Sequence, residues 1–152
     1  MNSSSYPGGS ETNQGFPQEF PGAQPLRRVL EAVGSVSWPA LGFEAGAGGP
    51  VLATRMLASI LVHAYSRGYL SSEEIEEACR TEDDFRYLCS GDAPEARIFR
   101  RFRRSNASAL AESLSILMTP SGTPDEARAV MRDRARRCLE SAIAADSLAL
   151  DL

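Results

Sequence analysis

The sequence contains no lysine and a single histidine, His63, so sixteen arginines supply its other basic side chains. Its three cysteines (Cys79, Cys89 and Cys138) are an odd number and form no C-x-x-C pair. This pattern excludes a complete disulfide framework and a zinc site built from paired cysteines. No nucleophile with a base, acid–base pair or metal cluster is recognisable. We therefore expect no enzymatic activity, no catalytic residue, no cofactor, no bound metal and no small-molecule substrate.

Long hydrophobic runs are also lacking. The longest apolar run, residues 56–65, is interrupted by Ser59 and His63 and is too short to span a bilayer. The first residues lack the basic and apolar regions of a signal peptide. We therefore expect a cytoplasmic protein with no membrane partner.

The N-terminal part is poor in apolar residues. Residues 1–25 hold four prolines, a Gly-Gly pair and three consecutive serines, and such a segment buries too little surface to offset its chain entropy. We expect a disordered tail over 1–25. Apolar residues at helical spacing predict a short helix over 26–33, and the Gly-, Ala- and Pro-rich residues that follow predict a linker to residue 50.

From Val51 onward, the apolar spacing is helical throughout, and no segment reads as a strand. Residues 51–65 form the expected core helix, which Gly68 ends in a left-handed cap. Ser71 and Glu74 form a capping box that opens a second helix. This succession suits a helix-turn-helix. The sequence predicts an all-α fold with a small helical domain over 51–118, a helix-turn-helix-like core, and an amphipathic C-terminal helix within 119–152.

Residues 97–104, Arg-Ile-Phe-Arg-Arg-Phe-Arg-Arg, divide into two faces when wound as a helix. At about 100° per residue, Ile98, Phe99 and Phe102 share one side. Four arginines share the other, and the fifth lies at the border. Phosphate of a nucleic acid is the usual anion for such a stripe, although a solvated face that pairs with acids of the same chain remains an equal alternative. The arginines are Arg97, Arg100, Arg101 and Arg104, with Arg103 at the border.

The net charge of −4 is unevenly distributed. Residues 73–84 hold seven acids and one arginine, a net of −6, whereas residues 93–105 hold five arginines and one acid, a net of +4. Because local potential decides what a surface attracts, the basic segment can bind an anion despite the overall sign.

Residues 51–104 resemble the N-terminal domain of bacterial insertion-sequence transposases of the DDE type. The resemblance rests on five ordered blocks. They are Tyr65-Ser66-Arg67-Gly68, Ser71-Ser72-Glu73-Glu74-Ile75-Glu76, Phe85-Arg86-Tyr87-Leu88, Pro94-Glu95 and Arg101-Phe102-Arg103.

Two positions depart from the family pattern, which has an arginine where Glu73 stands and a histidine where Ala96 stands. The family's ribonuclease-H-like catalytic domain is not recognisable before Leu152, and Asp151 alone cannot hold a metal pair. By resemblance, the chain is expected to be a transposase N-terminal domain encoded without its catalytic core, as a truncated or stand-alone fragment.

The resemblance implies a non-catalytic DNA-binding domain that recognises the terminal inverted repeats at the ends of a mobile element. The arginines would contact phosphates, and polar groups near the helix-turn-helix, Ser71 and Ser72 among them, would read sequence. Helix capping explains both serines equally well. The alternative is a protein-interaction or dimerisation module that regulates a full-length transposase, with a second copy or that transposase as partner.

Overall fold

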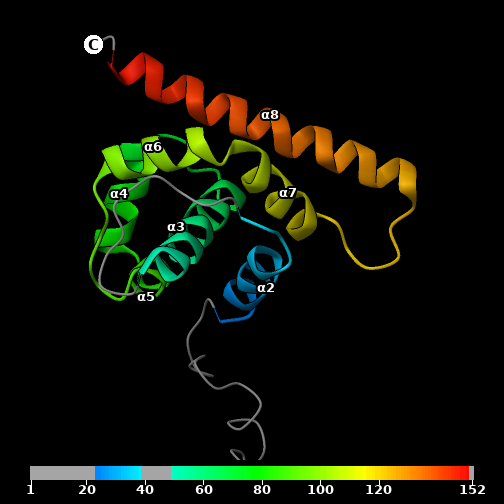
Figure 1. The fold of residues 1–152 in the computed structure, drawn as a ribbon, viewed down its shortest axis with the longest axis horizontal. Helices are drawn as coiled ribbons and strands as arrows, with labels where there is room; N and C mark the ends of the chain where they lie inside the picture. The colour runs from blue at the N-terminus through cyan, green and yellow to red at the C-terminus, as the bar shows by residue number, and fades with distance from the viewer. Residues whose placement is uncertain (1–22, 39–48, 151–152) are drawn as a thin grey trace, which may run out of the picture.

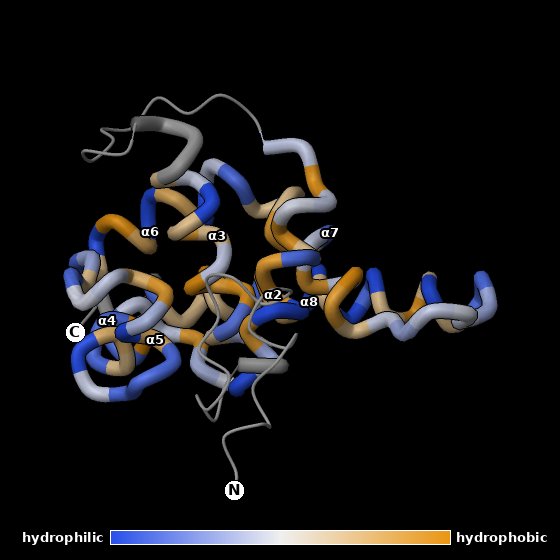
Figure 2. The backbone as a smooth tube through the Cα atoms, turned by 90° about the horizontal axis from the view of Figure 1, so that it is seen from below, coloured by the Kyte–Doolittle hydropathy of each residue, from blue (hydrophilic) through white to orange (hydrophobic). Residues whose placement is uncertain are grey.

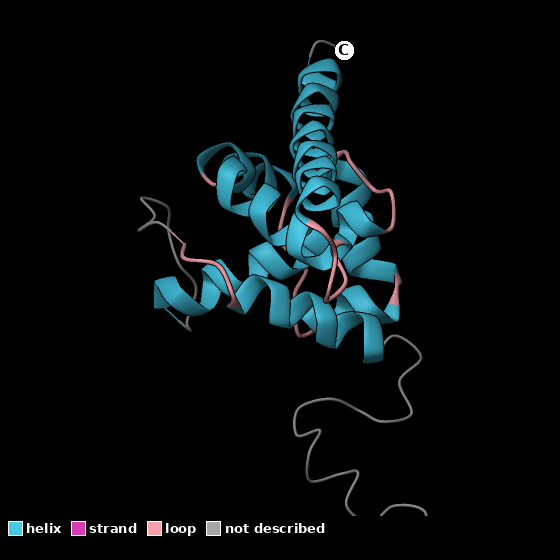
Figure 3. Ribbon diagram, turned by 90° about the vertical axis from the view of Figure 1, so that its right-hand side faces the viewer, coloured by secondary structure: helices cyan, strands magenta, loops and turns pink. Residues whose placement is uncertain are grey.

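The computed structural model describes residues 23–38 and 49–150, and the side chains of 25–38 and 53–146. In this part of the chain every regular element is an α-helix and no strand occurs (Figure 3). The predicted all-α class is confirmed. Of the predicted disordered tail, residues 1–22 lie outside the described part, as do residues 39–48 of the predicted linker. The predicted boundaries are wrong by two or three residues, because residues 23–25 and 49–50 are helical. None of the described helices has the length and apolar character needed to cross a membrane.

Seven helices follow one another along the described residues (Figure 1). They are α2 (Ala23–Gly34), α3 (Gly49–Ser66), α4 (Ser72–Thr81), α5 (Asp83–Leu88), α6 (Ala96–Ser105), α7 (Ala107–Met118) and α8 (Asp125–Leu150).

Helix α3 is the central element. Its residues from Leu57 to Tyr65 are all buried, and it contacts α2, α4, α5, α6 and α7. A helix that is apolar around most of its circumference has to be surrounded, which is why the shorter helices gather around it. The predicted core helix is confirmed.

The turn between α3 and α4 follows the local sequence. Gly68 has a φ of +85°, the left-handed conformation that glycine adopts without a Cβ clash. The amide of Tyr69 donates to the carbonyl oxygen of Ala64 at 2.9 Å, and the amide of Gly68 donates to that of Tyr65 at 3.1 Å. These two bonds make a Schellman cap. Both halves of the capping box that opens α4 are present.

Helix α2 packs in the same core as α3. Leu26, Val29 and Val33 are each at most 2% exposed, and α2 contacts both α3 and α7. The ring of Trp38, just after this helix, stacks on Phe102 of α6 with 6.2 Å between ring centroids. The residues before 51 therefore share one core with the helices that follow.

Helix α8 lies across α6 and α7 (Figure 1). Ala135, Leu139 and Ala142 recur at helical spacing and are at most 2% exposed, so they form the stripe that seats α8 on the body. Its first turns project beyond the other described helices (Figure 2). The predicted C-terminal helix is confirmed and runs from Asp125 to Leu150.

Candidate nucleic-acid interface

Helix α6 is held at its start by a carboxylate from another helix. The amide of Ala96 donates to Glu76 Oε1 of α4 at 3.1 Å, whereas the N-cap residue Glu95 makes no side-chain cap bond. An acid at a helix N-terminus satisfies an otherwise unpaired amide and complements the helix dipole. The acidic helix α4 therefore fixes where α6 begins.

The two faces predicted for α6 are present. Phe99 and Phe102 are at most 1% exposed and contribute to the core. On the other side, Arg97, Arg101 and Arg104 are exposed and Arg100 is half-buried. We call these four residues (Arg97, Arg100, Arg101 and Arg104) the arginine face.

Two members of the arginine face have partners within the chain. Arg97 Nε lies 2.6 Å from Glu95 Oε1, and both side chains are more than 60% exposed, so water competes strongly for this pair. Arg100 NH1 lies 2.6 Å from Glu73 Oε2 of α4, and the Arg100 side chain is 20% exposed. Glu73, one of the departures from the family pattern, thus neutralises one arginine and joins α4 to α6.

Arg101 and Arg104 are different. Neither side chain has a hydrogen bond or ion pair within the described part of the chain. Both residues are exposed, which makes them the members of the arginine face most available to an external anion. Among the described residues, the alternative of intramolecular pairing therefore applies to Arg97 and Arg100 and not to these two.

Arg103 requires a correction. The sequence places it at the border of the arginine face, but its side chain is 0% exposed and is paired with Asp146 of α8, which is also 0% exposed. Arg103 Nε donates to Asp146 Oδ2 at 2.9 Å, and NH2 lies 2.6 Å from Oδ1. On a helical wheel of α6, Arg103 is the arginine nearest the aromatic side, and it faces α8. Arg103 is therefore not available to DNA in this structure.

The remaining donors of Arg103 are also satisfied. NH1 donates to the carbonyl oxygen of Leu70 at 2.7 Å, and NH2 donates to that of Ala142 at 3.0 Å. Burial would lower the pKa of Arg103, but its contacts with Tyr65 and Asp146 outweigh that effect and raise it. Burial also raises the pKa of Tyr65 to about 12. The guanidinium is thus a fully bonded structural cation.

Ser72, like Arg103, is predicted from the sequence to contact DNA but is buried. Ser71 caps helix α4. Ser71 is the N-cap of α4, and its hydroxyl oxygen accepts from the amide of Glu74 at 3.1 Å. Ser72 is 0% exposed, and its amide donates to Asp146 Oδ1 at 3.2 Å. Asp146 therefore bonds the first residue of α4 as well as α6, and the Ser72 side chain cannot reach a ligand at the surface.

Sequence reasoning missed Asp146, although a signal for it was present. Asp146 lies four residues after Ala142 and seven after Leu139, which places it on the apolar stripe of α8. An acid on a buried stripe requires a buried cation, and Arg103 was the basic residue nearest the apolar face of α6.

A second polar cluster fastens the end of α3 to α5. His63 Nε2 lies 2.6 Å from Asp84 Oδ2, and Arg67 NH1 donates to the same oxygen at 2.7 Å. Arg67 NH2 and Tyr69 Oη both donate to Glu82, at 3.2 and 2.5 Å. Burial would raise the pKa of Asp84, but the bond from His63, the Phe85 amide and Arg67 together hold it below its usual value.

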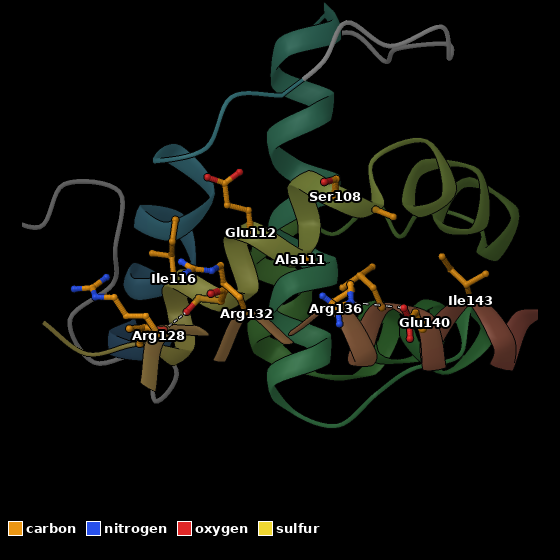
Figure 4. Close-up of a pocket in the computed structure, with 13 residues that line it drawn as sticks. Ser108, Ala111, Glu112, Ile116, Arg128, Arg132, Arg136, Glu140 and Ile143 are labelled. Carbon is orange, nitrogen blue, oxygen red and sulfur yellow. Dashed lines mark hydrogen bonds and ion pairs between the residues drawn. The ribbon is translucent and has the colours of Figure 1, made fainter. Parts of the chain in front are cut away.

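A cavity of about 660 Å³ is lined by residues of α7 and α8 (Figure 4). Arg128, Arg132 and Arg136 reach it from α8, and Glu112 of α7 and Glu140 of α8 also line it. These mixed charges favour phosphate less than the arginine face does. The described residues contain no cluster of three or more His, Cys, Asp or Glu side chains arranged to hold a metal ion.

The comparisons with known proteins point to one family. The family model described as "Transposase domain (DUF772)" matches residues 17–105, more than half of the 152-residue chain. Neither the curated proteins nor the solved structures contain a match.

Replacing Asp146 with Ala leaves the Arg103 guanidinium buried without its carboxylate. Uncompensated buried charges are costly, so we expect the free energy of unfolding to fall by about 3–5 kcal/mol in urea denaturation. Glu140→Ala is the matched control, because it removes an exposed carboxylate from the same helix and should change stability by less than about 0.5 kcal/mol. Equal losses for the two variants would contradict the assigned role of Asp146.

Asp84 should make folding sensitive to acid. Its pKa is lower in the folded state than its ordinary value of 3.8, so its contribution to stability is complete above about pH 4 and is lost as the pH falls further. Asp84→Asn should be less stable than the parent at neutral pH and should lose less stability on acidification. Urea midpoints between about pH 7 and pH 2.5 test this, with the exposed Asp83→Asn as control. A parent and Asp84→Asn variant with the same acid dependence would contradict it.

Proposed function

We propose that this chain, which belongs to the transposase-domain family DUF772, binds DNA and takes no catalytic step itself. The observation that carries the proposal is the state of α6. Its aromatic side is locked in the core, while Arg101 and Arg104 stand exposed without partners in the described part of the chain. A rigid helix that presents unpaired guanidinium groups can bind backbone phosphates without first breaking an internal ion pair.

Phosphate contact is the role we assign to the arginine face. Guanidinium groups donate two parallel hydrogen bonds to a phosphate and remain charged at every physiological pH. Arg101 and Arg104 would make the primary contacts. Arg97 and Arg100 could join by exchanging their carboxylate partners for phosphate, which costs little for the exposed Arg97–Glu95 pair.

Helix α4 is less suited to lie against DNA. In a helix-turn-helix, the second helix enters the major groove, but α4 exposes Glu73, Glu74 and Glu77, which phosphates would repel. We therefore propose that the α3–turn–α4 unit supports α6, through the Glu76 cap and the Glu73 pair, and that α6 is the element nearest the DNA. Ser71 remains the polar group of that turn that could approach a base or phosphate.

The DNA itself is proposed from the family. The resemblance to insertion-sequence transposases implies the terminal inverted repeats at the ends of a mobile element as the target. Phosphate contacts through α6 would bind any duplex weakly. Tighter binding to these ends would need contacts to base edges as well, for which Ser71 is the candidate.

Removing Arg101 and Arg104 should weaken DNA binding. Arg101→Gln/Arg104→Gln should lower affinity for duplexes of any sequence and reduce the slope of log K against log salt by about two, one for each lost phosphate contact. Fluorescence anisotropy of a labelled duplex over a salt series measures both quantities. Since both side chains are exposed, the helical circular dichroism should not change.

Arg132→Gln/Arg137→Gln is the matched control. It removes the same charge from exposed arginines of α8 and should leave the salt slope unchanged. Equal weakening by both double substitutions would show that binding follows net charge and not the arginine face.

The proposal also predicts binding without cleavage. Incubation of the purified chain with Mg²⁺ and a duplex that carries inverted repeats should leave the DNA intact on a denaturing gel, at protein concentrations that saturate binding. Metal-dependent cutting or joining by the chain alone would contradict the non-catalytic role.

A further inference from the structure

The first turns of α8 form a surface that the rest of the described chain does not use. They project beyond the other helices (Figure 2). Val130, in this projecting part, is 51% exposed and is the more exposed of the two large apolar side chains at the described surface. Glu126 and Arg134, four residues before and after it, are exposed as well.

These three side chains share one face of α8. Residues four apart lie nearly above one another on a helix, so Glu126, Val130 and Arg134 form a row of acid, apolar group and base. Leu139 is nine residues from Val130, about half a turn away around the helix axis, and it seats α8 on the body. The row therefore points away from the core.

The charges of this row have no partners in the described part of the chain. Neither Glu126 nor Arg134 has a hydrogen bond or ion pair there. The nearby Asp133 is already bonded by Arg136 and Arg137. An acid and a base thus remain unpaired at the two ends of an exposed apolar side chain.

We propose that this row, which we call the α8 row (Glu126, Val130 and Arg134), is the contact surface for a second copy of the chain. A row of acid, apolar group and base complements itself when a second copy lies antiparallel to it. The two-fold axis passes beside Val130, so that the two valines meet. Glu126 of each copy then faces Arg134 of the other, which gives two equivalent ion pairs, as an isologous interface requires.

The size and position of the α8 row determine what kind of dimer it makes. The α8 row offers one apolar side chain and two charged ones, so we expect the interface to bury less than the roughly 1,200 Å² that marks the lower limit of stable interfaces. The dimer is therefore weak, and salt weakens it further. Helix α6 lies near the opposite end of α8 from the projecting turns (Figure 1). The arginine faces of both copies therefore stay open, and the dimer does not depend on DNA binding.

Charge reversal tests the pairing. Glu126→Arg places arginine opposite arginine twice, and Arg134→Glu places glutamate opposite glutamate twice. In sedimentation equilibrium of the full chain without DNA, each single variant should associate about tenfold or more weakly than the parent, because two favourable exposed pairs become repulsive. Glu31→Arg is the matched control: it makes the same charge change at an exposed position on α2 and should associate like the parent.

Two rescue experiments separate pairing from damage to the helix. The double variant Glu126→Arg/Arg134→Glu restores opposite charges across the two-fold axis and should recover the association of the parent. A mixture of the two single variants also brings opposite charges together and should form a heterodimer more readily than either variant forms a homodimer. A monomeric parent at all concentrations, or failure of both rescues, would overturn the proposal.

Discussion

The arrangement of this protein depends on one buried contact, the ion pair between Arg103 and Asp146. The two residues are 43 positions apart and both side chains are fully buried. Together they bond the first residue of α4, the turn before it and the body of α8. A buried ion pair is costly unless its remaining donors and acceptors are satisfied, and here they are met by backbone groups of three different segments. The relative positions of α4, α6 and α8 are therefore coupled.

This coupling extends the folded unit beyond the segment that the family model recognises. The matched residues, 17–105, include Arg103 but not Asp146. Helix α7 also packs against α2 and α3. The elements that carry the arginine face are thus completed by residues from the last third of the chain. In the structure, α8 serves two purposes: it supplies the anion that Arg103 needs, and it presents a separate outward row.

Features set by neighbours within about four residues could be predicted from the sequence. The left-handed Gly68, the Ser71–Glu74 capping box and the two faces of α6 all follow from helical spacing. Partners distant in sequence could not be predicted. The helical wheel gives the direction in which the Arg103 side chain points, but not the helix that covers it. Likewise, nothing in the sequence near Ala96 indicates that Glu76 caps α6. Long-range packing therefore removes two residues from the predicted DNA contacts: Arg103 from the arginine stripe and Ser72 from the start of α4.

The most direct test is the arginine Nε–H spectrum of the isotopically labelled full chain during titration with duplex DNA. The signals of Arg101 and Arg104 should shift as DNA is added. The Arg103 signal, whose Nε–H is bonded to Asp146 in the interior, should exchange slowly with water and keep its position. A shift of Arg103 comparable to theirs, or shifts confined to the arginines of α8, would contradict the account.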